Sequence, residues 1–435
     1  MTVAQFTSPV AGRAPSARST PDTIRIGLLG FGQVGSAVAR LAAARPRSSR
    51  AEVEVTAALV RDSLRPRAMS GITLTVDPEE VFTTRPTVIV EALGGLEPAR
   101  TLVLEAIARG IPVVTANKSL LAHHGDEIAA AAALAGVPLR FEASVLAGVP
   151  FLGTFARRPY ASALASITGI VNGTTNFILS QMQDGTGDYR SALSDAQRRG
   201  FAEPDPASDV QGIDAVEKLT ILIRQFGGPG VAPWTIETAG IASVTPADLV
   251  HARELGGTLK PVVHATGLES DAVAAFAGPA FVSERHPLAR VHQVSNALCL
   301  RDVAGSDLCF AGPGAGPDVT AVTVLDDVIE AATTSVGEIW PTTARAGHAV
   351  PPVSAWFVRL TSTTALTANA DIASLLGTHG VSVERITARS TRDGRASLAM
   401  LTRPCGRPQI EYAAAALATA MGTTTRIFRA LELRA

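Results

Sequence analysis

The feature that most constrains the fold is a glycine-rich turn between an apolar run and a helical segment near the N-terminus. The run spans Ile24 to Leu29, the turn reads GFGQVG over residues 30–35, and the helical segment ends near Pro46. Strand, glycine turn and helix in this order are typical of a dinucleotide site, where the helix N-terminus presents free N–H groups to the phosphates. The residues predicted to contact the cofactor are Gly30, Phe31, Gly32, Gln33, Val34 and Gly35.

The next apolar run, Val53 to Val60, ends in Arg61 and Asp62. An NAD site commonly has an acidic residue at the end of this strand to hold the ribose hydroxyls, whereas an arginine pairs with the 2′-phosphate of NADP. Because the arginine comes first, the sequence favours NADP, with Arg61 as a binding residue. Asp62 keeps NAD open, and the alternative for Arg61 is an exposed loop residue.

Strands and helices continue to alternate further along the chain. Apolar runs at residues 87–91 and 111–114 are separated by a helical segment and are followed by Gly94-Gly95 and Lys118. This alternation predicts an α/β fold with a parallel sheet and ligands at the carboxyl ends of its strands. We therefore expect Gly94, Gly95 and Lys118 at the cofactor.

A second glycine-rich turn, GPGAG at residues 312–316, opens another predicted helix. We expect Gly314 to contact the cofactor, and a simple loop is the alternative. A Rossmann-type parallel-sheet domain is thus expected over residues 23–150, completed by a helix near residues 312–340.

Lysine is rare in this chain. Three of the 38 basic residues are lysine, namely Lys118, Lys218 and Lys260. Unlike arginine, a partly buried lysine can exchange a proton with a substrate near neutral pH. Lys118 and Lys218 are therefore candidate catalytic residues, while Lys260 lies in an apolar stretch and is expected to be structural.

Acidic residues gather before Lys218. Asp214 precedes it by four residues on a predicted helix, and Glu203, Asp205 and Asp209 come shortly before. An Asp–Lys pair at this spacing is usually a solvated surface pair. The density of carboxylates around one amine instead favours a polar substrate site.

The rest of the chain predicts two further domains. Residues 151–311 are expected to form an α+β substrate domain, and residues 353–435 have the βαββαβ order of a ferredoxin-like module. Residues 343–352 read as the linker. Residues 1–22, rich in Ser, Pro and Ala, are expected to be a disordered tail.

Composition excludes several classes of protein. The net charge of -1 argues against nucleic acid or an anionic membrane as the main partner. The long uncharged stretch from Pro159 to Gln183 holds too many polar residues to span a bilayer. The three cysteines are odd in number and lack CxxC spacing, so we expect neither a disulfide framework nor a zinc site, and a reducing cytoplasm fits best.

With these residues in hand, the chain resembles the homoserine dehydrogenase family along nearly its whole length. The resemblance is carried by GLLGFGQVG, VEALGG, TANKSLLA, VNGTTNFIL, GFAEPDPASDVQGIDAVEKLTIL, HPLARVHQVSNAL and GPGAG. It implies the NAD(P)-dependent interconversion of L-homoserine and L-aspartate 4-semialdehyde, in the pathway to threonine, methionine and isoleucine. It also implies a homodimer or higher homo-oligomer built through the substrate domain, and an ACT-like C-terminal domain.

The same resemblance assigns roles to individual residues. It implies that Glu203 binds the substrate ammonium, that Asp209, Asp214 and Thr174 belong to the substrate site, and that Lys218 and Lys118 transfer the proton. Which of the two lysines moves the proton stays open.

A monovalent cation such as Na⁺ is a further implication of the resemblance. Its expected ligands are Glu142, Val145, Ala147 and Val149. In this chain Leu146 replaces a family glycine, which would distort the turn if that position needs a positive φ. A second departure lies at residues 361–369, where the ACT pattern's Pro-Gly turn is missing, so we expect a weak or atypical threonine sensor.

Two other functions are alternatives to homoserine dehydrogenase activity for this sequence. A binding protein that senses NADP or an amino acid without turnover would not need both lysines and Glu203. Aspartate-semialdehyde dehydrogenase would need a nucleophilic cysteine in its catalytic half, and the first 298 residues contain none.

Overall fold

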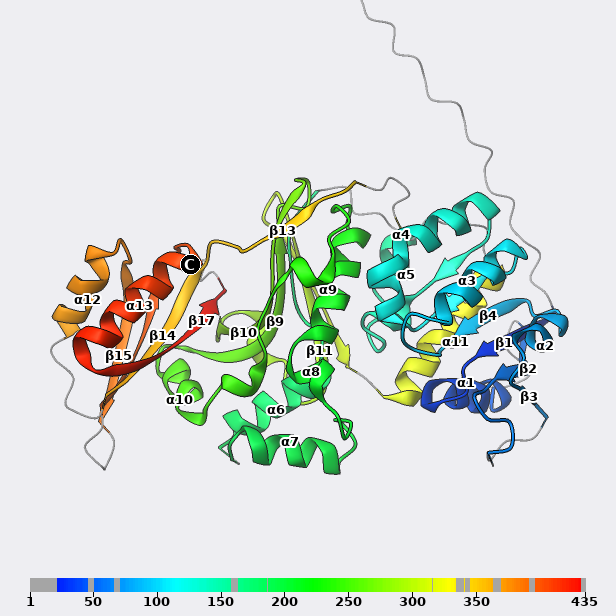
Figure 1. Cartoon of the computed structure of the whole chain (residues 1–435), viewed down its shortest axis with the longest axis horizontal. Helices are drawn as coiled ribbons and strands as arrows, with labels where there is room; N and C mark the ends of the chain where they lie inside the picture. Colours follow the sequence, from blue (N-terminus) through cyan, green and yellow to red (C-terminus); the bar gives the residue numbers. More distant parts are fainter. Residues whose placement is uncertain are drawn as a thin grey trace, which may run out of the picture.

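The computed structural model shows three parts arranged in a row (Figure 1). It describes residues 22–45, 51–65, 71–157, 163–185, 187–314, 316–333, 340, 345–362, 369–390 and 396–431. The expected disordered tail, apart from Asp22, and most of the 361–369 turn therefore lie outside the described residues.

The first part is the expected Rossmann-type domain. Its six parallel strands are in the order β3-β2-β1-β4-β5-β6, the order of a dinucleotide-binding sheet. The strands are β1 (Thr23–Leu29), β2 (Glu52–Leu59), β3 (Thr73–Thr75), β4 (Val88–Glu91), β5 (Val113–Thr115) and β6 (Leu139–Arg140). The helices are α1 (Gln33–Ala43), α2 (Pro78–Thr83), α3 (Ala99–Ala108) and α4 (Lys118–Ala135).

The helix expected near residues 312–340 completes this domain as α11 (Pro317–Thr333). Ala321, Val324 and Val328 of α11 are buried in one hydrophobic cluster with Ala37 and Val38 of α1. Small alanine side chains on both helices allow this close packing. The chain thus returns from the central part to the N-terminal domain through α11, as Figure 1 shows.

The central part is a mixed sheet covered on one face by helices. Its strands are β7 (Leu164–Ile170), β8 (Glu237–Thr238), β9 (Gly257–Thr266), β10 (Ala272–Ser283), β11 (Ser295–Asp302), β12 (Asp307–Pro313) and β13 (His348–Val350). Its helices are α5 (Leu152–Arg157), α6 (Gly173–Gln183), α7 (Tyr189–Arg198), α8 (Ala207–Val210), α9 (Ile213–Gln225) and α10 (Pro246–Glu254), with short 3₁₀ turns at Pro233–Thr235, Ile241–Ser243 and Pro287–Arg290. A further 3₁₀ turn, Glu142–Ser144, follows β6 and contacts α11.

The C-terminal part has the predicted βαββαβ order. Its elements are β14 (Ala355–Ser362), α12 (Asn369–Thr378), β15 (Val383–Ser390), β16 (Ala396–Thr402), α13 (Arg407–Met421) and β17 (Thr423–Ala430). These strands continue the central sheet, because Ala280 and Phe281 of β10 pair with Arg429 and Ala430 of β17. The sequence did not predict this junction. A buried ion pair between Arg359 of β14 and Asp248 of α10 strengthens it.

One expectation about the cysteines is wrong. Cys299 on β11 and Cys309 on β12 are joined by a disulfide, and Cys405 is free and buried. The antiparallel register of the two strands places Cys299 directly opposite Cys309. A separation of ten residues does not reveal such a pairing, because it depends on where the hairpin turns.

No helix in the described part of the chain is both long enough and apolar enough to cross a lipid bilayer. The segment Pro159 to Gln183 is divided between β7 and α6 in its described portion.

Candidate active site

Two lysines that are 100 positions apart in the sequence meet on one carboxylate. Lys118 Nζ lies 3.1 Å from Asp214 Oδ1, and Lys218 Nζ lies 3.0 Å from Asp214 Oδ2. Lys118 is the first residue of α4, at the carboxyl end of the parallel sheet, while Asp214 and Lys218 lie one turn apart on α9. The site therefore joins the Rossmann-type domain to the central domain.

The loop between β7 and α6 supports this cluster. The Asn172 side-chain amide donates hydrogen bonds to Asp209 Oδ1 and Asp214 Oδ2, both at 2.8 Å. The Val171 carbonyl accepts a hydrogen bond from Lys218 Nζ at 2.8 Å. The side-chain oxygen of Asn172, Oδ1, caps α6 by accepting from Thr175 N. One residue thus starts a helix and orients two acidic groups.

The electrostatics of the cluster favour the charged forms of Asp214 and Lys118 and oppose the ionisation of Asp209. Burial by itself raises the pKa of Asp214, but the ammonium groups of Lys218 and Lys118 and the Asn172 hydrogen bond outweigh it and bring that pKa to about 2. The charge of Asp214 raises the pKa of Lys118 against the opposing effect of burial. Burial and the neighbouring charge of Asp214 raise the pKa of Asp209.

The loop that precedes α9 carries the other expected substrate residues. Glu203 is exposed and its backbone carbonyl accepts a hydrogen bond from Gln197, at 3.2 Å. Thr174 Oγ1 donates to the Phe201 carbonyl at 2.7 Å. The Thr174 hydroxyl therefore holds this loop against the start of α6, beside Asp209.

The glycine turn has the geometry that a dinucleotide needs. Gly30 has a φ of +106°, and a Cβ there would lie 2.5 Å from the Ala92 carbonyl oxygen. A Cβ on Gly35 would lie 2.2 Å from the Gly30 carbonyl oxygen, so only glycine lets α1 pack this closely on the turn. Gly32 faces open space at the start of α1, where a phosphate can approach the backbone.

A buried glutamate shapes the loop that contains Gly94 and Gly95, which the sequence predicts to contact the cofactor. Glu91, at the end of β4, accepts hydrogen bonds from Leu93 N at 2.8 Å and from Thr115 Oγ1 at 2.6 Å. Asn117 Nδ2 bonds both Glu91 Oε1 and the Gly95 carbonyl. Gly94 and Gly95 both have positive φ and face open space. The loop is thereby fixed directly beside Lys118.

The other two predicted cofactor positions differ in exposure, because Gly314 is buried and Arg61 is exposed. Arg61 is exposed just beyond the end of β2. Gly314 lies between β12 and α11, and its carbonyl accepts a hydrogen bond from Asn296 Nδ2 at 3.1 Å. Asn296 also reaches the Val171 carbonyl that receives Lys218, which connects this turn to the lysine cluster.

Protein-family models match most of the chain. The model described as homoserine dehydrogenase matches residues 150–329, and the model described as homoserine dehydrogenase, NAD binding domain, matches residues 30–142. The chain belongs to the homoserine dehydrogenase family. It is an oxidoreductase of amino-acid biosynthesis that interconverts L-homoserine and L-aspartate 4-semialdehyde, and it has an NAD(P)-binding domain.

Relatives and solved structures agree with this membership. The homoserine dehydrogenase of Synechocystis is 38% identical over 315 residues, covering 71% of this chain and 73% of the relative. That of Corynebacterium glutamicum is 36% identical over 348 residues, covering 77% of each chain. The crystal structure of a homoserine dehydrogenase from Thiobacillus denitrificans superposes with a TM-score of 0.85 at 31% identity, covering 95% of this chain and 99% of that one. A hyperthermophilic archaeal homoserine dehydrogenase in complex with NADPH gives a TM-score of 0.59 at 27% identity, covering 71% and 97%.

The loop expected to hold a cation in a homoserine dehydrogenase is well ordered by hydrogen bonds. The Glu142 carboxylate accepts from the backbone N–H groups of Phe151, Leu152 and Gly153, and the Ala147 carbonyl accepts from the Thr323 hydroxyl. Among the described residues, Arg85 and Gln293 are the non-glycine positions with positive φ. Leu146 is buried and is not one of the residues with a positive φ, so its side chain does not strain the backbone of the turn.

The surroundings of this loop are acidic. Asp327 Oδ2 accepts a hydrogen bond from Glu142 N at 3.0 Å, and burial raises the pKa of both Asp327 and Glu142. Glu330 adds a third carboxyl group, opposed by Arg140. The described residues contain no group of three or more His, Cys, Asp or Glu side chains with metal-binding geometry. The expected cation ligands are of a different kind, one carboxylate and three backbone carbonyls, and burial opposes the ionisation of the Glu142 and Asp327 carboxyl groups beside them.

Sequence reasoning missed several residues of this homoserine dehydrogenase site. Asn172, Glu91 and Asn117 lie within the motifs that carry the family resemblance, yet their roles follow only from their hydrogen bonds. Glu217, one residue before Lys218, is buried and accepts a hydrogen bond from Ser119. Its position three residues after Asp214 on a helix was the available signal.

Proposed function

We propose that Lys218 and Lys118 transfer the proton in the homoserine dehydrogenase reaction. The observation that carries the proposal is the shared bridge of both ammonium groups to Asp214. A buried carboxylate holds the two amines side by side and raises the pKa of Lys118, an arrangement suited to general acid–base catalysis.

The direction of proton transfer depends on the charge of the lysines. When bound, the nicotinamide cofactor supplies or accepts the hydride. During semialdehyde reduction a protonated lysine donates its proton to the oxygen that becomes the alcohol, and during homoserine oxidation a neutral lysine takes the hydroxyl proton. Because Asp214 raises the pKa of Lys118, the resting form suits reduction, and homoserine oxidation requires higher pH.

The substrate is held by the loop before α9. Glu203 is exposed there and supplies a carboxylate for the substrate ammonium, while Asp209 and Thr174 complete the polar lining beside Asn172. Asp214 acts on the lysines more than on the substrate, because its oxygens are already engaged by Lys118, Lys218 and Asn172.

The cofactor is NADP in this proposal, with NAD as the weaker alternative. Arg61 supports this preference, because its exposed guanidinium stands at the end of β2, where the ribose of a bound dinucleotide is read. The archaeal relative in complex with NADPH is in keeping with it. A monovalent cation such as Na⁺ would be held by the Glu142 carboxylate and the carbonyls of Val145, Ala147 and Val149, and would favour the ionised form of the carboxyl groups whose pKa burial raises.

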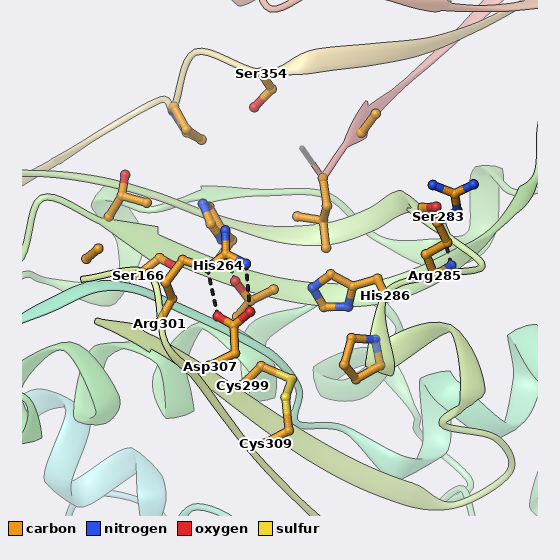
Figure 2. Close-up of a pocket in the computed structure, with 18 of the residues that line it drawn as sticks. Ser166, His264, Ser283, Arg285, His286, Cys299, Arg301, Asp307, Cys309 and Ser354 are labelled. Atoms are coloured by element: carbon orange, nitrogen blue, oxygen red, sulfur yellow. Dashed lines mark hydrogen bonds and ion pairs between the residues drawn. A yellow bond between two sulfur atoms is a disulfide. The ribbon is translucent and has the colours of Figure 1, made fainter. Parts of the chain in front are cut away.

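A homodimer through the central domain is also proposed. A cavity of about 1050 Å³ opens on the sheet face opposite the helices, and Figure 2 shows Ser166, His264 and the Arg301–Asp307 ion pair among its lining residues. Its described lining comes from the central sheet and the C-terminal unit, not from the lysine cluster. Burial lowers the pKa of His264 to about 4, so its imidazole is neutral at pH 7.

The domain division follows the same proposal. Residues 23–150 with α11 bind the cofactor, residues 151–311 bind the substrate, and residues 353–435 form an ACT-like module that senses threonine weakly or atypically. The role in amino-acid biosynthesis favours a cytoplasmic location.

Replacement of the lysines tests the catalytic proposal. Lys218→Ala and Lys118→Ala should each lower turnover by at least about 10²-fold, the usual scale of general acid–base catalysis, while the protein stays folded. Lys218→Arg is the matched control, because it keeps the charge beside Asp214 but cannot give up its proton. Near-normal turnover in a folded Lys218→Ala or Lys218→Arg protein would remove Lys218 from the reaction.

A further inference from the structure

Glu217 makes a buried contact across the two domains that hold the active site. Its side chain is on α9, and Glu217 Oε2 accepts a hydrogen bond from Ser119 Oγ of α4 at 2.9 Å. Glu217 is 7% exposed, although an unpaired glutamate is rarely buried to this extent. We therefore ask what the buried Glu217 carboxyl group does at the contact between α9 and α4.

The contact lies directly beside the proton-transfer lysines. Asp214, Glu217 and Lys218 are at positions i, i+3 and i+4 of α9 and share one face of the helix. Lys118 and Ser119 are the first two residues of α4. Two parallel contacts therefore join α4 to α9, one from Lys118 to Asp214 and one from Ser119 to Glu217.

The charge of Glu217 acts on Lys118. The groups facing Lys118 are Asp214 and Glu217 of α9 and Asp209 of α8, and all three raise its pKa. The groups facing Glu217 are Ser119, Lys118 and His123 of α4 and Asp214 of its own helix. Burial raises the pKa of Glu217, while the Ser119 hydrogen bond and the charge of Lys118 oppose that rise.

We propose that Glu217 is a positioning residue for Lys118, which holds the first turn of α4 against α9 through Ser119 and places a second negative charge beside the Lys118 ammonium. This inference rests on the proposed role of Lys118 in proton transfer. Apolar packing of α4 on α9 and the Asn117 cap already hold the start of α4. The Ser119–Glu217 hydrogen bond adds a second polar contact there, one residue from Lys118, and so restricts the direction of its ammonium further.

The charge has a separate consequence from the hydrogen bond. Two carboxylates beside Lys118 keep it protonated over a wider pH range than Asp214 alone, which favours proton donation to the semialdehyde oxygen. Loss of the charge should therefore change the pH dependence, whereas loss of the hydrogen bond alone should change the rate.

Two variants separate these effects. Glu217→Gln removes the charge but keeps an oxygen that can accept from Ser119, and Ser119→Ala removes the hydrogen bond but keeps the charge. The measurement is the pH profile of kcat/KM for homoserine oxidation by the full-length protein. Glu217→Gln should move the acidic limb of the profile to lower pH by at least about half a unit, the low end of the effect of a neighbouring charge. Ser119→Ala should lower kcat by about threefold to tenfold with the limb in place, because a lost hydrogen bond is worth about 1 kcal/mol.

The outcome is read together with Lys118→Ala. Suppose that folded Glu217→Gln has the same acidic limb in its pH profile as wild type, while Lys118→Ala is inactive. That result would contradict the role of Glu217 and leave the catalytic role of Lys118 in place. An active Lys118→Ala protein would instead show that the proposed function of Lys118 is wrong. If Glu217→Gln does not fold, Glu217→Ala removes the same charge, and the same displacement of the limb is expected.

Discussion

The bridge at Asp214 allows a prediction about stability. Asp214 is fully buried, and its pKa falls from 3.8 to about 2 despite the opposing effect of burial, because Lys218 and Lys118 hold its charge. That difference corresponds to about 2 kcal/mol of stabilisation at neutral pH. Since the pKa in the folded state is lowered, the contribution is fully present above pH 4 and is lost as the pH falls through about 2.

Asp214→Asn should cost more than this contribution alone. The substitution leaves two partly buried ammonium groups without their buried counter-ion, and breaking a fully buried ion pair costs about 3–5 kcal/mol, which is an upper limit here. The assay is urea unfolding of the wild-type and variant proteins at pH 7 and pH 3, with Asp22→Asn as the matched control at an exposed position. At pH 3 about half of the ionic contribution to stability should be lost. The difference in the free energy of unfolding between the wild-type and variant proteins should therefore be smaller at pH 3 than at pH 7.

Two results would refute the reasoning. If Asp214→Asn unfolds at pH 7 like the Asp22→Asn control, the bridge does not stabilise the fold. If the free energies of unfolding of wild type and Asp214→Asn differ equally at pH 7 and pH 3, the stabilisation does not come from the ionised carboxylate.

Other predictions concern cofactor, substrate, cysteines and regulation. Arg61→Ala should raise the KM for NADP by about tenfold and leave the KM for NAD nearly unchanged, because a charge-assisted hydrogen bond to the 2′-phosphate is lost; equal effects on both would show that Arg61 does not read the phosphate. Glu203→Gln should raise the KM for homoserine with little change for the cofactor, and an unaltered homoserine KM would remove Glu203 from the ammonium site. Denatured, unreduced protein should react with one equivalent of a thiol reagent at Cys405, and with three after reduction; three without reduction would contradict the Cys299–Cys309 disulfide. L-Threonine at low millimolar concentration should inhibit weakly, and strong inhibition would show a working effector site.

Much of the fold could be predicted because it rests on local patterns. The turn at Gly30 to Gly35 requires glycine for steric reasons that are visible in the sequence, and the apolar runs around it have the lengths of buried strands. The spacing of Asp214 and Lys218 likewise predicts one helix face. Such features depend on residues that are a few positions apart in the sequence, so they can be predicted without the tertiary structure.

The sequence by itself determined the dinucleotide turn, the order of strands and helices, and the choice of Lys118 and Lys218 as residues able to move a proton. Only the tertiary structure decided that these lysines share Asp214, that Glu217 reaches Ser119, that Cys299 pairs with Cys309, and that β17 extends the central sheet. Each of these contacts joins segments whose separation is set by strand register and by the packing of α4 on α9. Register and helix packing depend on the whole buried surface, and no short stretch of sequence encodes them.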